Sequence, residues 1–373
     1  MSIEALKTEY ENAPREQRQA VLAKMYKSLE KAPVSELDAA TTQLLPLILV
    51  PSPNQAADVA LTLGAFVELG ANPAPLANAL LAPLTRWVSA AARFASQVAD
   101  FDDAPDDIPE ADVMLMDDRR IFRADVDQLH EEDAEAVASW FSLEVWFRPA
   151  VASLTRTPEA LRNAREDSTL RNALNALEDL PGGARWLRVL LDSCAGERLV
   201  LVVPELKEAF ELKADGVVDV GQLSVLLSTV LAGPLSRIHA SGPADASVIK
   251  TMLGEGPQQT NGSYASHFFI YPWRAMNPQT RLPEDERHWW HSPGGRGSHS
   301  LASDFQPATV EPLDDARVFF LVGPQLPSLK HRFVRSIGGT RMFDKLTARL
   351  SEPVAADYEK WMTRIFNAVT AAN

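Results

Sequence analysis

The chain has 373 residues, of which 46% are hydrophobic, and it carries a formal net charge of −14 with a sequence pI of about 5.0. This length predicts about two or three domains, and the composition is sufficient for a buried core, so disorder along the whole chain is excluded. The negative charge repels a phosphate backbone at long range and argues against nucleic acid as a partner.

Cysteine usage and hydropathy predict a cytoplasmic protein without a membrane span. The single cysteine, Cys194, cannot form an internal disulfide, and we expect a small, buried side chain there rather than a nucleophile. Residues 1–10 are polar and lack the basic-then-apolar pattern of a signal peptide. The longest strongly apolar run, residues 44–50, is interrupted by Pro46 and is far shorter than the roughly 20 residues that a membrane helix needs.

Apolar residues with helical spacing predict four helices in the first hundred residues. The first follows Pro14, which suits the start of a helix, and the second begins at Ser35. We expect Asn54 to cap the third helix and Gly70 to end it. The fourth helix carries a long apolar stripe over residues 76–98.

The connections between these helices predict a bundle over residues 1–99. Because residues 70–73 form a short turn, the third and fourth helices should pair as an antiparallel hairpin. The pattern is similar to that of armadillo or HEAT repeats, but it has no strict period and fewer than three repeats. We therefore predict an irregular helical bundle.

An acidic segment follows the bundle. Nine of the nineteen residues in 100–118 are Asp or Glu, and like charges at this density resist compaction. Clustered carboxylates could also bind a divalent cation, although the segment lacks the ligand spacing and central glycine of an EF-hand loop. We interpret residues 100–118 as an acidic linker and leave the metal loop as the alternative.

Helices are predicted to continue through residues 119–195, with essentially no strand before about residue 195. Two of them lie within 158–180 and 184–194. Another begins near Asp133 and is aromatic on most sides, which predicts a buried helix. Its aromatic residues are Trp140, Phe141, Trp146 and Phe147.

The apolar pattern then becomes short and β-branched, which predicts a small α+β domain over residues 196–373. A further strand-like run covers residues 217–220, and a C-terminal amphipathic helix packs on the core. The fold class is therefore α+β, with a predominantly helical N-terminal bundle before a small sheet with packed helices. The strands of that sheet are expected at residues 199–203, 209–213, 268–271 and 318–322.

A long loop, residues 272–312, contains the first candidate site. Three of the seven histidines, His288, His291 and His299, lie within twelve residues, and Asp304 could add a carboxylate. Imidazole is a common metal ligand and the usual acid–base group near pH 7. The alternative is a set of exposed loop histidines beside aromatic residues that hold the loop to the core.

A basic segment near the C-terminus is the second candidate site. Glycines before a capping threonine present free backbone N–H groups at a helix start, and this arrangement attracts anions. Neighbouring basic side chains could add contacts to phosphate or carboxylate. Salt bridges to the protein's own acidic helices are the alternative. The candidate anion-binding residues are Lys330, Arg332, Arg335, Gly338, Gly339, Thr340 and Arg341.

Three segments resemble a family of uncharacterised bacterial proteins. They read WFSLEVWFRPAVASL, GERLVLVVPELKEAFELKADGVVDVGQLSVLLSTVL and YPWRAMNPQTRLPEDERHWW. The resemblance covers roughly residues 40–365 and implies that the protein is one evolutionary unit. It implies no activity, cofactor or catalytic residue.

Together these observations predict a non-catalytic cytosolic binding or scaffold protein. Its helical region would contact another protein or a second copy of itself, and its basic segment would bind a small anionic ligand. The alternative is a metal- or histidine-dependent enzyme with its site in the 272–312 loop. The residue pattern names no cofactor.

Overall fold

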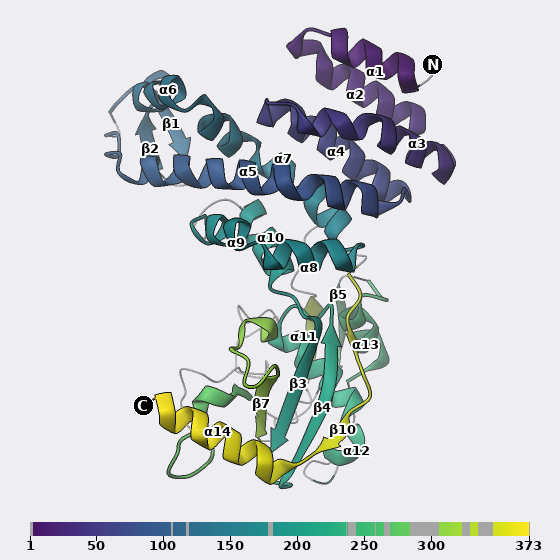
Figure 1. Ribbon diagram of the computed structural model, residues 1–373, viewed down its shortest axis with the longest axis vertical. Coiled ribbons are helices and arrows are strands. Elements are labelled where there is room, and N and C mark those ends of the chain that lie inside the picture. Colours follow the sequence, from purple (N-terminus) through teal and green to yellow (C-terminus); the bar gives the residue numbers. More distant parts are fainter. Residues whose placement is uncertain are drawn as a thin grey trace. The chain divides into compact units, whose positions relative to one another are not determined.

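The computed structural model describes residues 3–105, 107–116, 119–177, 182–235, 237, 244–257, 259–264, 269–283, 306–322, 329–334 and 346–372. The protein divides into two compact units, Met1–Leu191 and Asp192–Asn373. The first unit is almost entirely helical and the second combines a sheet with helices (Figure 1). The helix-rich α+β class predicted from the sequence is therefore confirmed. Among the helices that the structure describes, none has the length and apolar composition of a membrane span.

The first unit contains ten α-helices and one short hairpin within its described residues. Its elements are α1 (Ile3–Asn12), α2 (Arg15–Leu29), α3 (Val34–Leu44), η1 (Leu45–Leu49), α4 (Pro53–Leu69), α5 (Pro73–Ala99), η2 (Glu110–Asp112), β1 (Val113–Met116), β2 (Arg119–Phe122), α6 (Arg123–Glu132), α7 (Ala134–Leu154), α8 (Pro158–Glu166), α9 (Ser168–Asn175) and α10 (Gly182–Leu191).

Several helix boundaries follow from local capping chemistry. Gly70 ends α4 with a φ of 115°, a left-handed conformation that glycine adopts without steric cost. The side chain of Asn72 caps α5 by accepting a backbone N–H from its first turn. The prediction that Asn54 caps α4 is wrong, because Ser52 is the N-cap and Pro53 occupies the first helical position. Proline suits this position because the first N–H groups of a helix have no intrahelical acceptor.

Helix α7 is the central element of the first unit. Helices α4 and α5 follow one another across a short turn and contact each other, but each packs mainly against α7. The reason is the aromatic, apolar surface of α7, which includes the fully buried Trp146. A small residue lets the backbones approach: a Cβ atom at Gly64 would lie 2.8 Å from the Cα of Pro149.

The stretch from 158 to 180, predicted to be helical, contains two helices. Asp167 ends α8 and accepts a hydrogen bond from the backbone N–H of Leu170 at 3.0 Å, which caps α9. An aspartate at this position satisfies a free N–H group of the new helix, so a change in backbone direction costs little.

The acidic segment is partly folded rather than a simple linker. Strands β1 and β2 pair antiparallel, and Asp103 forms a further bridge with Ile121. The guanidinium of Arg123 donates to the carbonyl oxygen of Ala111 at 2.8 Å and holds the segment that leads into β1. The expectation of essentially no strand before residue 195 is therefore wrong. Backbone pairing and arginine donors fix a segment whose acidic side chains remain mostly exposed.

The second unit contains a sheet, a separate two-stranded ladder and several helices. Its elements are β3 (Ala195–Val203), β4 (Glu208–Asp215), α11 (Val220–Val230), α12 (Ala232–Leu235), α13 (Ala246–Leu253), β5 (Gln259–Tyr264), β6 (Phe269–Pro272), η3 (Trp273–Ala275), η5 (Pro307–Thr309), β7 (Arg317–Val322), β8 (Leu329–Val334), β9 (Arg349–Leu350), β10 (Val354–Ala356) and α14 (Tyr358–Ala372).

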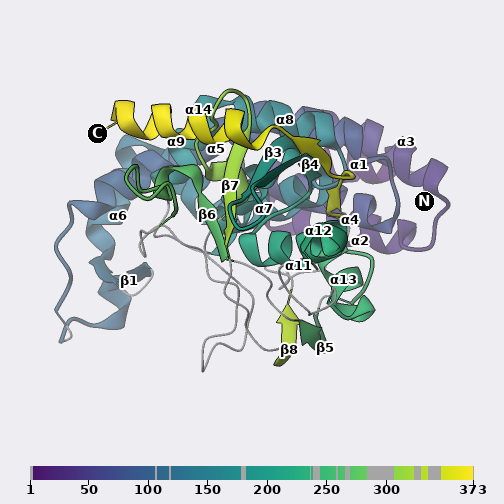
Figure 2. The ribbon, with the colours of Figure 1, turned by 90° about the horizontal axis from the view of Figure 1, so that it is seen from below.

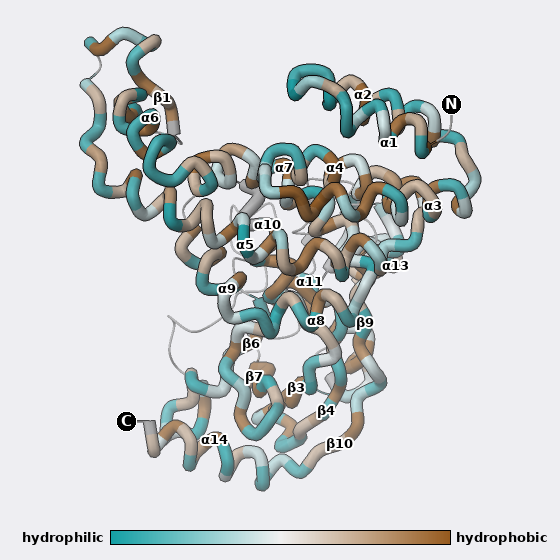
Figure 3. The backbone as a smooth tube through the Cα atoms, turned by 45° about the horizontal axis from the view of Figure 1, so that its top comes forward, coloured by the Kyte–Doolittle hydropathy of each residue, from teal (hydrophilic) through white to brown (hydrophobic). Residues whose placement is uncertain are grey.

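The main sheet has the strand order β10-β4-β3-β7-β6, and β9 also pairs with β4. The four strands predicted for it are confirmed as β3, β4, β6 and β7. Strand β3 pairs parallel with β7 and antiparallel with β4, and its hydrophobic residues are visible as brown in Figure 3. Helix α14 covers one face of this sheet and α11 with α13 the other, while β5 and β8 form a separate ladder (Figure 2).

The strand-like run at residues 217–220 does not form a strand. Gly216 has a φ of 65°, and a Cβ atom there would collide with the backbone carbonyl of Thr347. The backbone turns at this glycine, and Asp219 then caps α11 by accepting the backbone N–H of Gln222 at 2.7 Å. A capping aspartate thus starts a helix where β-branched composition alone favoured a strand.

Candidate functional site

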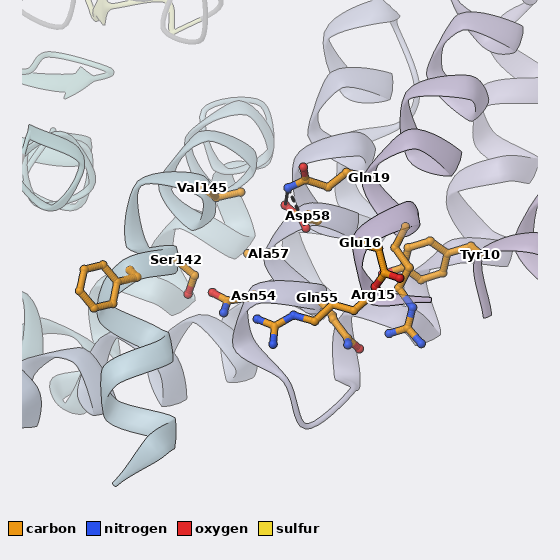
Figure 4. A pocket seen from close by; sticks show the side chains of 12 residues that line it. Tyr10, Arg15, Glu16, Gln19, Asn54, Gln55, Ala57, Asp58, Ser142 and Val145 are labelled. Atoms are coloured by element: carbon orange, nitrogen blue, oxygen red, sulfur yellow. Dashed lines mark hydrogen bonds between the residues drawn. The ribbon is translucent and has the colours of Figure 1, made fainter. Parts of the chain in front are cut away.

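A polar cleft of about 480 Å³ lies in the first unit between α1, α2, α4 and α7. Figure 4 shows its side chains, which come from parts of the sequence more than a hundred residues apart. Its volume lies within the range of about 300–1,000 Å³ that is typical of ligand pockets. The residues that line it are Tyr10, Arg15, Glu16, Arg18, Gln19, Asn54, Gln55, Ala57, Asp58, Phe141, Ser142 and Val145.

The corner between α1 and α2 supplies the cations. Pro14 starts α2, so Arg15, Arg18 and Gln19 lie in its first turns, three and four residues apart and on one side of the helix. The Arg18 Nε donates to the carbonyl oxygen of Ala13 at 3.1 Å. Its guanidinium also lies 5.6 Å from the centre of the Tyr10 ring, in cation–π geometry.

The first two turns of α4 supply the amides and the carboxylate. Asn54, Gln55 and Asp58 are spaced by three and four residues, which places them on one side of the helix. Both carboxylate oxygens of Asp58 accept a hydrogen bond from the Gln19 Nε2 at 3.4 Å. This long, weak contact joins α2 to α4 (Figure 4). The buried Ala57 lies between these polar groups and α7.

Helix α7 forms the apolar wall. Phe141 is 51% exposed, an unusual fraction for a large aromatic ring on a central helix. Val145 lies one turn further on, and the buried Ser142 between them donates to the carbonyl oxygen of Ser139 at 3.0 Å. Four residues after Val145 comes Pro149, which has no N–H group, so the carbonyl of Val145 lacks its usual intrahelical donor.

The cleft shifts the pKa values of two of its groups, Asp58 and Tyr10. Burial raises the pKa of Asp58 above its ordinary value of 3.8, and the hydrogen bond from Gln19 offsets part of this rise. Burial also raises the pKa of Tyr10; the Arg18 cation lowers it and the Asp58 carboxylate raises it further. A carboxyl group whose pKa is shifted by partial desolvation is a frequent property of functional sites.

Several lining groups have unused hydrogen-bonding capacity. Within the described parts of the protein, the side chains of Arg15, Asn54 and Gln55 make no hydrogen bond or ion pair. In Figure 4 these three side chains lie along the same stretch of the cleft. Guanidinium and amide groups donate, while amide oxygens and Asp58 accept, so the cleft can bind a ligand that carries both kinds of partner.

The histidine site predicted in the long loop lies outside the described residues, as His288, His291, His299 and Asp304 all do. In the part of the protein that the structure describes, no group of three or more His, Cys, Asp or Glu side chains has metal-binding geometry. The histidine site stays a prediction. Cys194 is buried, with 1% exposure, as predicted.

The predicted anion site is described only in part. Lys330 and Arg332 lie in β8, where their backbones pair with Ser263 and Asn261 of β5. The remaining candidates, Arg335, Gly338, Gly339, Thr340 and Arg341, lie outside the described residues. Anion binding by this segment therefore also stays a prediction.

The sequence analysis missed the cleft altogether. It traced the apolar stripes of the helices, whereas the cleft is lined mainly by polar side chains of α2 and α4 and by two aromatic rings. One local signal was available: Arg15 with Gln19, and Asn54 with Asp58, are polar pairs four residues apart at helix starts. Such pairs are common on solvated helix faces, so this signal alone could not mark a site.

Comparison of the sequence and structure with protein-family models, with curated proteins and with solved structures finds no match. The resemblance to uncharacterised bacterial proteins therefore stays a prediction, and the geometry of the described residues is the evidence for function.

Proposed function

We propose that this protein is a non-catalytic binding protein whose helical unit holds a segment of a partner protein in the cleft. The carrying observation is the set of lining groups without partners among the described residues, Arg15, Asn54 and Gln55, beside the half-buried Asp58. Side-chain amides match the N–H and C=O groups of an extended peptide, and the exposed Phe141 offers an apolar contact. A cytosolic location is part of this proposal and is supported by the single, buried Cys194.

The test is selection of peptides from a random displayed library on the full-length protein, followed by affinity measurements on two tryptophan variants. Asn54→Trp places a large ring in the cleft, and Glu68→Trp adds the same ring at an exposed position of the same helix. We expect selected peptides to bind Asn54→Trp at least about tenfold more weakly, a loss of roughly 1.4 kcal/mol, and Glu68→Trp like the wild type.

Equal binding of every selected peptide to the wild type and Asn54→Trp would contradict the proposal. Each substitution lies at a helical position with room toward solvent, so both variants should fold. Circular dichroism of each variant is the folding control.

A further inference from the structure

The hairpin of β1 and β2 leaves one strand edge open. Strand β2 pairs with β1 on one side, and on its other side Ile121 forms a bridge with Asp103. Among the described residues, no strand pairs with the outer edge of β1. Figure 1 shows this hairpin beside α6 at one end of the long α5, and it shares no residue with the cleft. An open edge of this kind can accept the backbone of another chain.

The pairing register shows which backbone groups face the open edge. The carbonyl oxygen of Arg120 accepts the N–H of Ala104 at 2.7 Å, so the backbone groups of Arg120 point away from β1. Its partner in β1 is Leu115, and in an antiparallel ladder such a pair exchanges no hydrogen bonds. The N–H and C=O of Leu115 therefore point outward, and neither has a hydrogen-bond partner in the part of the chain that the structure describes.

The edge lacks the devices that usually protect a free strand. Charged side chains, prolines and bulges keep edge strands from pairing with other chains, and β1, which reads Val-Met-Leu-Met, has none of these. Arg123 donates to the carbonyl oxygen of Val113 at 3.4 Å, so the open backbone groups centre on Leu115. The side chain of Leu115 is 72% exposed, and a strand added here would also bury apolar surface.

The surroundings of this edge are strongly acidic. Residues 100–132, which contain the hairpin and α6, have thirteen Asp or Glu and three Arg, so they carry ten of the fourteen net negative charges of the chain. Asp107, Glu110 and Asp112 are exposed and precede β1 directly. None of these three carboxylates forms an ion pair within the described ranges.

Two arginines of this region are already bound to the backbone. Arg120 donates to the carbonyl oxygen of Ile108 at 2.9 Å, and Arg123 donates to that of Ala111 at 2.8 Å. Their hydrogen bonds thus go to carbonyl groups and leave the carboxylates open. The excess negative charge attracts cations over about a Debye length, roughly 8 Å at physiological ionic strength.

This charge selects between the occupants that the edge could take. Two copies of β1 paired edge to edge would bring two acidic segments together, and facing like charges oppose such pairing. A nucleic acid is repelled for the same reason. An extended segment with lysine or arginine side chains gains both the backbone hydrogen bonds of the edge and the attraction of the carboxylates.

We infer that the outer edge of β1 binds a lysine- or arginine-rich segment of a partner protein as an additional β-strand. The N–H and C=O of Leu115 pair with the backbone of this segment, and an apolar residue of the segment lies beside the Leu115 side chain. Its basic side chains meet the carboxylates of Asp107, Glu110 and Asp112. Because this surface is separate from the cleft, the inference stands independently of the proposed function.

The test is a peptide selection on the full-length protein and on one proline variant. Leu115→Pro removes the outward N–H and keeps the ladder between β1 and β2, because the Leu115 N–H takes no part in that ladder. A displayed library of random peptides is selected on the wild type and depleted on Leu115→Pro. We expect the surviving peptides to be net positive, with basic and apolar residues in alternation. Neutral or acidic survivors, or no survivors, would contradict the inference.

Affinities of the surviving peptides, measured by fluorescence anisotropy, test the backbone contact. We expect Leu115→Pro to weaken binding by at least about tenfold. Leu115→Val is the matched control, because it keeps the N–H and an apolar side chain, and it should bind like the wild type. Undiminished binding to Leu115→Pro would show that the peptides do not pair with this edge.

A pair of triple variants tests the charges. One neutralises the three exposed acids before β1 and should weaken binding by about tenfold, with a smaller dependence of affinity on salt. The control neutralises three exposed acids elsewhere in the first unit and should change neither property. The first is Asp107→Asn, Glu110→Gln, Asp112→Asn, and the control is Glu30→Gln, Glu36→Gln, Glu68→Gln. Equal losses in both would assign binding to overall charge and overturn the inference.

Two further measurements complete the design. Self-association of the wild type that Leu115→Pro abolishes, followed by sedimentation, would assign the edge to a second copy and overturn the inference. Protection of the Met114 amide from hydrogen exchange shows that the hairpin of Leu115→Pro is still folded, because Met114 bonds to β2. If that protection is lost, the two triple variants decide the outcome.

Discussion

At the scale of single residues, Gly64 permits the close packing of α4 on α7. Replacement by alanine would improve helix propensity by about 1 kcal/mol but would place a Cβ 2.8 Å from the Cα of Pro149. Backbone cannot move aside as a flexible side chain can, so overpacking should dominate. We expect Gly64→Ala to destabilise the first unit by about 1–3 kcal/mol in urea unfolding, with Glu68→Ala as the exposed control. A more stable Gly64→Ala protein would show that the two helices can separate freely.

Asp58 gives a second prediction at this scale, through pH. Because burial raises the pKa of Asp58 above 3.8, its ionisation costs the folded state more than the unfolded state. The contribution of protonated Asp58 to the free energy of unfolding is fully present below about pH 3.8. It is lost as the pH rises through the pKa that Asp58 has in the folded state.

Asp58→Asn should therefore be slightly more stable than the wild type at pH 7, and this gain should shrink as the pH falls toward 3.8. The gain is small because water screens a half-buried charge. Urea unfolding at several pH values measures it, and Glu68→Gln sets the background. If the stability difference between Asp58→Asn and the wild type is constant with pH, the loss of the Asp58 charge is not its cause.

At the scale of elements, two of the three serines of α7 differ in whether their buried hydroxyl has a hydrogen-bond partner. The hydroxyl of Ser139 is fully buried and has no hydrogen-bond partner among the described groups, whereas that of Ser153 donates to the carbonyl of Pro149 at 2.7 Å. Removal of an unsatisfied buried group should stabilise a protein, and removal of a bonded one should not.

We expect Ser139→Ala to raise the free energy of unfolding by about 1 kcal/mol and Ser153→Ala to leave it unchanged or lower it. Chemical denaturation of both variants under one set of conditions gives the comparison. Equal effects of the two substitutions would indicate that Ser139 has a buried water as its partner.

The acidic segment yields a prediction about proteolysis. The bond from Arg123 to Ala111 holds the residues before β1, so Arg123→Ala should be cut faster by a protease specific for acidic residues. The control is Asp127→Ala, at an exposed position of the same helix. We expect no protection by micromolar calcium in either protein. Strong calcium-dependent protection would instead indicate a metal-binding loop.

Elements with a strong internal pattern were predictable, and those that depend on distant partners were not. Local sequence was enough to predict the apolar stripe of α5, the glycine at the end of α4 and the runs that form β3 and β7. Hydrophobic periodicity and helix capping act within a few residues. Strands β9 and β10 have two and three residues and exist because β4 offers an edge. The cleft was unpredictable for the same reason, since Arg15 and Phe141 line one cleft only after α4 packs on α7.

At the scale of the whole molecule, each unit has a core of its own. The second unit is built around β3, in which Leu201 is fully buried, and the first around α7. Separate cores predict separate cooperative unfolding transitions rather than one.

We expect Leu201→Ala, which should cost about 2–5 kcal/mol, to lower the midpoint of one transition, and Gly64→Ala to lower that of the other. Near-UV circular dichroism and calorimetry of the full-length protein would follow both transitions. If both variants shift a single common transition, the two cores are energetically coupled and the division into units has no thermodynamic meaning.

The central position of α7 also bears on how the protein is made. The ribosome delivers α4 and α5 before α7, so the apolar faces that pack on α7 emerge from the exit tunnel without that partner. Between residues 99 and 154 this interval lasts on the order of several seconds at ordinary elongation rates. The nascent N-terminal helices are thus exposed to aggregation until α7 arrives. Native packing of the first unit is largely a late event of translation, and the newly made polypeptide is a natural client for chaperones.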